Sequence, residues 1–150
     1  GNLRQPDEAE ESYQKALQYV DRMSERERYR TLGGYYLLVS RNYPEAIASY
    51  EKLVELYPAD GGGHSNLALS YLYERDFEKA VQEGKVAVDL DPGNMLKRMN
   101  YSMYAMYAGD FETSIAESQK VLEQNPSFGY AIFTAARSAA AADRLEEAAQ

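Results

Sequence analysis

The sequence contains no cysteine, no tryptophan and a single histidine, His64. Without thiols the chain can form no disulfide scaffold, no thiolate metal site and no cysteine nucleophile. One imidazole leaves almost nothing for a protein-only zinc site or for a histidine-based catalytic triad. These absences predict a chain that is not an enzyme, with no catalytic, cofactor-binding or metal residues and no cofactor.

Positive charge and long apolar runs are also scarce. The chain has 16 basic against 24 acidic residues, a formal net charge of −8. Neither half is basic, which argues against a nucleic-acid footprint or a polybasic membrane contact. No apolar run approaches the ~20 residues that span a bilayer, and no signal peptide is visible. We therefore expect no nucleic-acid or membrane partner and a cytoplasmic location, for a chain that we take to be a fragment of a longer protein.

The sequence does contain an internal repeat. Pro58, Pro92 and Pro126 are separated by 34 residues each time. One aromatic column and two columns of small residues follow the same period. The columns are Tyr43, Phe77, Phe111 and Leu145; Gly34, Ala68, Ser102 and Ala136; and Ala46, Ala80, Ser114 and Ala148. Four columns in phase predict one repeated structural unit.

Each unit is predicted to be a pair of helices. Apolar residues recur at spacings of three and four on both sides of the polar turn at Arg75-Asp76. Pro92 ends the second helix because it lacks an N–H and clashes with the preceding turn. Small side chains let two antiparallel helices approach to about 8 Å, and the aromatic after the turn fills the wedge. Because no pair can bury its face alone, neighbouring pairs must stack.

The pattern sets the helix and repeat boundaries. Ser24 and Glu27 form a capping box, which starts a helix near residue 25. We predict helices at 7–22, 25–40, 44–57, 63–74, 77–90, 95–108, 111–124 and 129–142, with a separate stub at 145–150. One domain over 1–150 then holds a partial repeat at 7–24, repeats at 25–60, 61–94 and 95–128, and a truncated repeat at 129–150.

This pattern resembles the tetratricopeptide repeat (TPR). The best-matching unit, Gly61 to Asn94, has Leu67-Ala68, Tyr71, Ala80, Ala87 and Pro92 at the signature places of the family. Gly84 departs from the large residue usual at its place, where Tyr50 conforms. The resemblance implies an all-α, right-handed superhelical solenoid of antiparallel helix pairs, with about eight helices plus the stub. It implies no activity, because the fold is a platform.

The family resemblance also implies a concave groove lined by the first helix of each pair. Methionine adapts its shape and tyrosine offers rigid area, so this groove suits an apolar or aromatic segment. The spacing of Met99, Met103 and Met106 places them on one helix face. It does not decide whether that face lines the groove or packs in the core. The candidate partner-binding residues are Tyr35, Leu69, Tyr73, Met99, Met103, Met106, Tyr107, Tyr130, Phe133 and Arg137.

The predicted function is a protein–protein interaction scaffold that binds a peptide or partner segment in this groove. One alternative is self-association into a homo-oligomer through the truncated C-terminal edge. Another is a regulatory or sensor module of a larger bacterial signalling protein, such as a Ser/Thr kinase. The stretch Asp21–Arg30 supports that context, because it is similar to TPR arrays attached to bacterial Ser/Thr protein kinases.

A chaperone-binding clamp is not expected. Family members that hold an acidic C-terminal peptide use Lys, Asn and Arg at set groove places, and Asn66 matches one of them. Four other residues occupy the remaining places where clamp residues should be. They are Thr31, Tyr35, Leu96 and Asn100, while Lys97 and Arg98 lie off the groove face.

Two further patterns are predicted to be structural. Gly61-Gly62-Gly63 leads into a helix as phosphate loops do, but no lysine follows, and Asp60 as N-cap competes for the same amides. We therefore predict an inter-repeat turn, with His64 on the surface. Four acids crowd the first helix start, where the macrodipole favours them, without the geometry of a metal site. They are Asp7, Glu8, Glu10 and Glu11.

Overall fold

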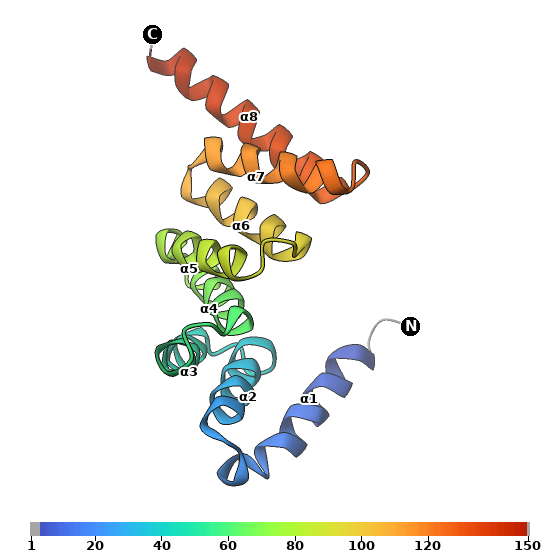
Figure 1. Ribbon diagram of the computed structural model, residues 1–150, viewed down its shortest axis with the longest axis vertical. Helices are drawn as coiled ribbons and strands as arrows, with labels where there is room; N and C mark the ends of the chain where they lie inside the picture. Colours follow the sequence, from blue (N-terminus) through green and yellow to red (C-terminus); the bar gives the residue numbers. More distant parts are fainter. Residues whose placement is uncertain (1–3, 150) are drawn as a thin grey trace. The chain divides into compact units, whose positions relative to one another are not determined.

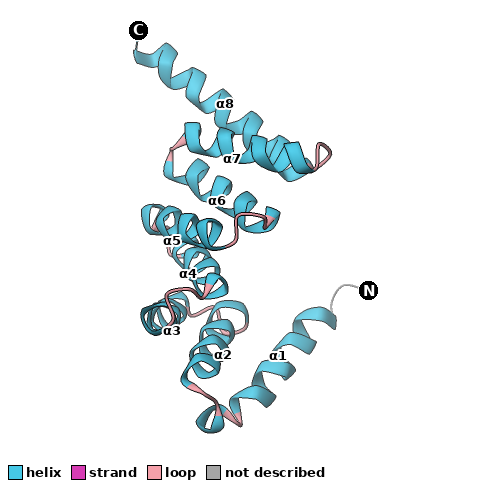
Figure 2. Cartoon of the chain, viewed as in Figure 1, coloured by secondary structure: helices cyan, strands magenta, loops and turns pink. Residues whose placement is uncertain are grey.

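The computed structural model describes residues 4–149, with side chains described for 10–144. Within this range all regular structure is helical, joined by short turns (Figure 2). The helices form two compact units, the first ending at Arg75 and the second starting at Asp76. The elements are α1 (Arg4–Leu17), η1 (Val20–Arg22), α2 (Glu25–Leu38), α3 (Tyr43–Leu56), α4 (Gly61–Tyr73), α5 (Phe77–Leu90), α6 (Met95–Ala108), α7 (Phe111–Gln124) and α8 (Gly129–Ala149), labelled in Figure 1.

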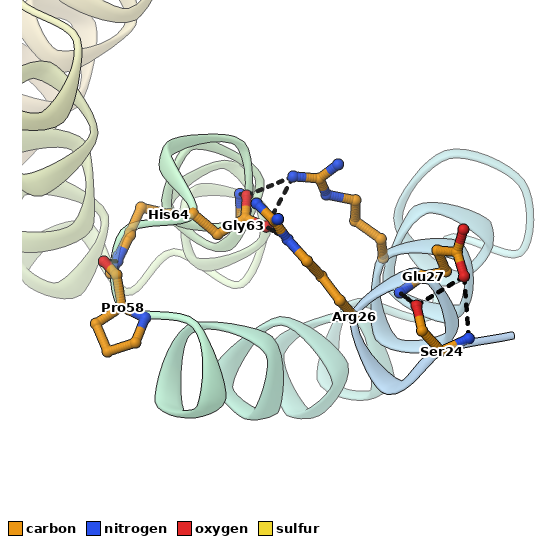
Figure 3. A network of polar contacts seen from close by, with 8 residues as sticks. Ser24, Arg26, Glu27, Pro58, Gly63 and His64 are labelled. Carbon is orange, nitrogen blue, oxygen red and sulfur yellow. Dashed lines mark hydrogen bonds and ion pairs between the residues drawn. The ribbon is translucent and has the colours of Figure 1, made fainter.

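Side-chain caps start the helices from α2 to α7. Each cap accepts a hydrogen bond from the backbone N–H three residues later, which satisfies an amide that the first helical turn leaves unpaired. The predicted capping box of Ser24 and Glu27 is confirmed (Figure 3). The caps are Ser24, Asn42, Asp60, Asp76, Asn94 and Asp110. Because these signals are local, the predicted bounds 77–90, 95–108 and 111–124 agree with α5, α6 and α7.

The turn between the two helices of a pair uses a residue with left-handed backbone. Arg41, Arg75 and Gly109 have φ values of 53°, 63° and 83° and follow one another at the repeat period. A residue in this conformation ends a helix and reverses the chain. The second helix of the pair then starts two residues later, at the aromatic column.

The prediction of a separate stub at 145–150 is wrong. The chain continues as α8 from Gly129 to Ala149 without interruption. Asp143-Arg144 takes the place of the turn, but it stands among alanines and other strong helix formers, with no glycine or proline to end the helix. The side chains of Leu145 and Ala148, which belong to the predicted columns, lie outside the described residues.

The first predicted helix, 7–22, is also placed incorrectly. The helix α1 starts earlier, at Arg4, with Pro6 in its first turn, where its missing N–H costs nothing. It ends at Leu17, and the chain turns through η1 into an extended residue, Met23. These residues cannot remain helical because they must reverse the chain toward the cap of α2.

In the first unit, two adjacent glycines of α2 each face a tyrosine ring from a different neighbouring helix. A Cβ atom on Gly33 would lie 2.8 Å from the ring of Tyr50 in α3, and one on Gly34 would lie 2.3 Å from Tyr13 Oη in α1. Tyr50 is buried, and burial raises the pKa of its phenol. The close approach of α2 to both neighbours therefore requires the absence of side chains at these two positions.

In the second unit, a glycine takes the place of the large residue of α3, and the following helix supplies a ring. Gly84 of α5 stands where Tyr50 stands one repeat earlier, and the ring of Tyr104 in α6 fills the space. A Cβ atom on Gly84 would lie 2.8 Å from Cδ2 of Tyr104. Since Tyr104 is only 1% exposed, its ring has no free space to move into. The departure of Gly84 from the family pattern is thus compensated by its neighbour on α6.

Four buried serines join α6, α7 and α8. Ser102 Oγ donates a hydrogen bond to the carbonyl of Ser114 at 2.8 Å and lies 2.7 Å from Ser118 Oγ. Ser114 Oγ lies 2.8 Å from Ser138 Oγ, which brings α8 into the network. Because the hydroxyls satisfy one another, their burial carries little penalty.

The surface position predicted for His64 is wrong. The residue is 7% exposed, and its Nε2 lies 2.9 Å from the carbonyl oxygen of Pro58 (Figure 3). The reason is that α4 starts directly after the turn that follows α3, so its first turn packs back onto Pro58.

The predicted N-cap at Asp60 is confirmed, and it is also the centre of an ionic cluster. Its Oδ1 accepts a hydrogen bond from the Gly63 amide at 2.9 Å, while Arg26 and Arg30 pair with Oδ2 at 3.0 and 2.7 Å. Burial opposes ionisation of this carboxylate, but the hydrogen bonds from Arg30, Gly63 and Arg26 outweigh it. They lower the pKa of Asp60 from 3.8 to about 2. The cluster ties α2 to the start of α4.

The contact at Gly84 predicts a large effect of one methyl group. Gly84→Ala should destabilise the protein by about 1–3 kcal/mol, because the buried Tyr104 ring must move. The matched control is Gly93→Ala, where a Cβ atom would meet nothing within 4 Å. Thermal unfolding of both variants measures the difference, and equal midpoints would contradict the described packing.

The pKa of Asp60 predicts a pH-dependent stability. Because its folded pKa lies below 3.8, its contribution is full above that pH and disappears as the pH falls toward 2. Asp60→Asn keeps the cap but loses the charge. It should lower the free energy of unfolding by about 1–2 kcal/mol at pH 7 and by progressively less below pH 4. Urea unfolding of both proteins from pH 7 to pH 3 tests this, and a gap that does not change with pH would contradict it.

Candidate functional site

The predicted partner-binding residues fall into two groups, one in each unit. Tyr35 on α2 and Leu69 and Tyr73 on α4 lie in the first unit, and Tyr73 is the most exposed of the three. The remaining candidates lie on α6 and α8 in the second unit. We call the exposed or half-exposed members of that second group the α6–α8 face. It comprises Met103, Tyr107, Tyr130, Phe133 and Arg137.

Met99 and Met106 do not belong to a groove. Met99 is 2% exposed and packs in a core cluster with Val121 of α7 and Ala131 of α8, and Met106 is 8% exposed. The two methionines are seven residues apart and therefore share one stripe of α6, which the neighbouring helices cover. Their assignment to the partner-binding set is wrong, whereas Met103 remains half-exposed at the edge of this stripe.

Contacts between side chains hold the α6–α8 face in place. The hydroxyl of Tyr130 donates a hydrogen bond to the sulfur of Met103 at 3.2 Å. The rings of Tyr130 and Phe133 lie 6.3 Å apart, and the Arg137 guanidinium lies 5.4 Å from the centre of the Phe133 ring. Residues three and four apart on a helix are neighbours, so α8 presents these three side chains as one row.

Stacked aromatic pairs orient the tyrosines at the ends of α4 and α6. Tyr73 stacks on Tyr43 at 4.8 Å, and Tyr107 stacks on Phe77 at 5.7 Å. In both cases the aromatic after the turn meets a tyrosine 30 residues later. Sequence reasoning missed this pairing, although the 30-residue spacing was available as a signal. Phe111 also follows a turn, but the residue 30 positions later is Ala141, so the third repeat has no such aromatic pair.

The basic residues of α6 are committed to neighbouring acids. Arg98 pairs with Glu117 of α7 and donates a hydrogen bond to the Pro92 carbonyl at 2.8 Å. Lys97 pairs with Asp91 at 3.1 Å. Neither side chain is presented to a ligand, so the described part of α6 offers no free cation for an acidic peptide.

No metal or membrane site appears in the part of the chain that the structure describes. Within it, no three His, Cys, Asp or Glu side chains gather closely enough to hold a metal ion. Of the acidic group at the first helix, Asp7 and Glu8 have side chains outside the described residues. None of the described helices has the length and hydropathy needed to cross a membrane.

Comparison with known proteins identifies the repeat. Residues 31–94 match the family model described as tetratricopeptide repeat. This stretch of the chain is a tetratricopeptide repeat segment. No curated protein matches it.

Solved TPR structures share this fold at low sequence identity. The TPR2B domain of yeast Sti1 in complex with an Hsp70 peptide is 16% identical, with a TM-score of 0.68 over 77% of this chain and 96% of that one. The Sgt2 TPR domain of Aspergillus fumigatus is 18% identical, with a TM-score of 0.71 over 85% of each chain. The first TPR of Spaghetti (RPAP3), bound to the HSP90 peptide SRMEEVD, is 20% identical, with a TM-score of 0.72 over 79% of this chain and 94% of that one. The likeness establishes the all-α fold of helices packed in sequential pairs.

The division between core and surface methionines predicts two different mutational costs. Met99→Ala should destabilise the TPR fold by about 2–5 kcal/mol, because it leaves a cavity among α6, α7 and α8. Met103→Ala should cost no more than about 1 kcal/mol, because its side chain is half in solvent. Denaturant unfolding measures both, and similar losses would show that Met103 is also a core residue.

Proposed function

We propose that the chain is an interaction scaffold that binds an apolar segment of a protein partner on the α6–α8 face. The observation that carries this proposal is the exposure of three aromatic side chains on two neighbouring helices. Tyr107, Tyr130 and Phe133 are 47%, 48% and 49% exposed. Grouped exposed apolar residues are typical of interaction sites.

The restricted mobility of these three aromatic side chains supports binding. Contacts with Met103, Phe77 and Arg137 restrict the three rings before any partner arrives. A restricted aromatic ring loses little conformational entropy on association, and its affinity is correspondingly higher. In the first unit, Tyr35, Leu69 and Tyr73 offer a second surface of similar composition.

The chemistry of the chain favours a partner segment with few acids. The Spaghetti (RPAP3) structure holds a peptide with three acidic residues, SRMEEVD. This chain carries a net charge of −8, and Lys97 and Arg98 are already paired. An acidic peptide would therefore meet repulsion from the net charge, and Arg137 is the one cation that the α6–α8 face offers it. We infer an apolar segment that is neutral or basic.

Self-association is a second candidate, supported by the outer side of α8. Its inner side packs through the buried residues Ala131, Thr134 and Ser138, whereas Ile132 on the other side is 49% exposed. Ala136 and Ala139 beside it are also exposed. No further helix covers this side among the described residues, and a second copy would bury it.

A regulatory role in a bacterial signalling protein rests on Asp21–Arg30 alone. Neither the family match nor the similar solved structures support it. The cytoplasmic location also remains a prediction from composition.

Peptide selection tests the proposed function. A phage-displayed library of random peptides is selected on the wild-type chain, and the affinity of enriched peptides is measured by fluorescence anisotropy. We expect apolar, acid-poor peptides, and we expect the double variant Tyr130→Ser and Phe133→Ser to lower their affinity at least about tenfold without loss of helicity.

The control is Ile132→Ser, which changes an equally exposed residue on the same helix. It should leave peptide affinity unchanged and should reduce any concentration-dependent mass seen by sedimentation velocity. Enrichment of acidic peptides, or unchanged affinity of the double variant, would contradict binding at this face.

A further inference from the structure

A pocket in the first unit lies where three helix ends meet. Its volume is about 370 Å³, and its lining comes from the end of α2, the turn after it, the start of α3 and the end of α4. This volume lies in the range of small-ligand sites. The lining residues are Leu37, Leu38, Arg41, Tyr43 and Tyr73.

The walls of this pocket combine leucine side chains with the more polar surface of two tyrosines and an arginine, and the tyrosine pair is preformed. Leu37 is buried, whereas Leu38 is exposed. The rings of Tyr43 and Tyr73 lie nearly parallel, with centroids 4.8 Å apart and planes inclined by 14°. Because each ring restricts the other, the pair offers a rigid aromatic surface to a ligand.

Arg41 is the one charged residue of the lining. Among the described residues, no ion pair or hydrogen bond of its exposed guanidinium is found, and no acid lines the pocket. Its backbone is left-handed, at φ 53°, a conformation that disfavours residues with a Cβ atom. The corresponding turn after α6 uses Gly109, so the fold does not require arginine at this position.

We propose that this pocket binds a ligand that carries an aromatic or large aliphatic group and a carboxylate a few bonds away. The apolar group lies against the Tyr43–Tyr73 pair, and the carboxylate accepts hydrogen bonds from Arg41. A guanidinium can bind a carboxylate through two parallel hydrogen bonds, which a neutral amide cannot match. A single carboxylate suits the site better than an acidic peptide, because the net charge of the chain is −8.

This inference is independent of the α6–α8 face. Two sources have the required chemistry, namely the C-terminal residue of a peptide and a free aromatic carboxylic acid. The volume fits a group of about the size of one large residue, and both sources provide one.

A matched pair of probes tests the carboxylate. N-acetylphenylalanine and N-acetylphenylalaninamide share the ring and differ in the carboxylate, and each is titrated into the full chain. The methyl resonances of Leu37 and Leu38 report binding by NMR. We expect saturable shifts with the acid and at least about tenfold weaker binding of the amide. Equal affinities, or no shifts with either probe, would overturn the proposal.

Variants at one turn position test Arg41. Arg41→Gln should reduce the affinity of the acid to that of the amide and leave the amide unchanged. Arg75→Gln is the control, because Arg75 holds the same turn position one repeat later, with φ 63°, and does not line the pocket. Equal losses in both variants would indicate a general charge effect and would overturn the site. Circular dichroism of both variants checks the fold.

A third arm distinguishes the sources and the two proposals. An octapeptide ending in phenylalanine that binds more tightly than N-acetylphenylalanine would assign a peptide C-terminus, whereas equal affinity would assign a free acid. Both results are consistent with a pocket that binds an apolar group and a carboxylate. The double variant Tyr130→Ser and Phe133→Ser should leave acid binding unchanged, so failure of the α6–α8 face would be seen separately.

Discussion

Close helix contacts in this protein occur where one helix lacks a side chain and its neighbour supplies a tyrosine ring. At Gly33 and Gly84 a single added methyl group would lie 2.8 Å from such a ring. Short turns join α2 to α3 and α5 to α6, the helices that meet at these two glycines. Gly33 meets Tyr50 within one helix pair, α2 and α3, whereas Gly84 meets Tyr104 between two successive pairs, at α5 and α6, so contacts of the same kind occur at different places in the repeat. Each pair depends on one small and one large partner, whichever helix provides them.

Sequence reasoning succeeded where the signals are local and failed where a neighbouring helix decides. Caps and turn residues predicted α5, α6 and α7 to the residue, because a hydrogen bond within one turn needs no distant partner. Both ends of the chain were predicted less well: Asp143-Arg144 carries no stop signal, and α8 therefore continues. Met99 and Met103 cannot be separated by spacing, because burial depends on where α7 and α8 lie. His64 was misplaced for the same reason, since its partner is a carbonyl beyond its own helix.

The distribution of charge restricts what the candidate sites can bind. Arg26 and Arg30 neutralise Asp60, and Arg98 is held by Glu117. These pairs join helices, so their cations serve the fold. Arg41 and Arg137 differ, because Arg41 lines the pocket beside Tyr43 and Tyr73, and Arg137 lies over an aromatic ring. A cation beside exposed apolar surface suits a ligand that is mainly apolar and carries few acids, and the ligand proposed for the pocket carries one carboxylate.

The aromatic stacks connect stability with recognition. Tyr73 and Tyr107 are each fixed on one side by the ring that follows a turn, and each leaves about half of its surface in solvent. Removing either tyrosine would therefore change the packing and the binding surface together, and the result could not be assigned to one of them. On α8 the position that would meet Phe111 is Ala141, and the row Tyr130, Phe133 and Arg137 is ordered instead by contacts along α8 and by the hydrogen bond from Tyr130 to Met103. Because Tyr130 and Phe133 take no part in these stacks between helices, substitutions on α8 can remove binding and leave the stacks intact.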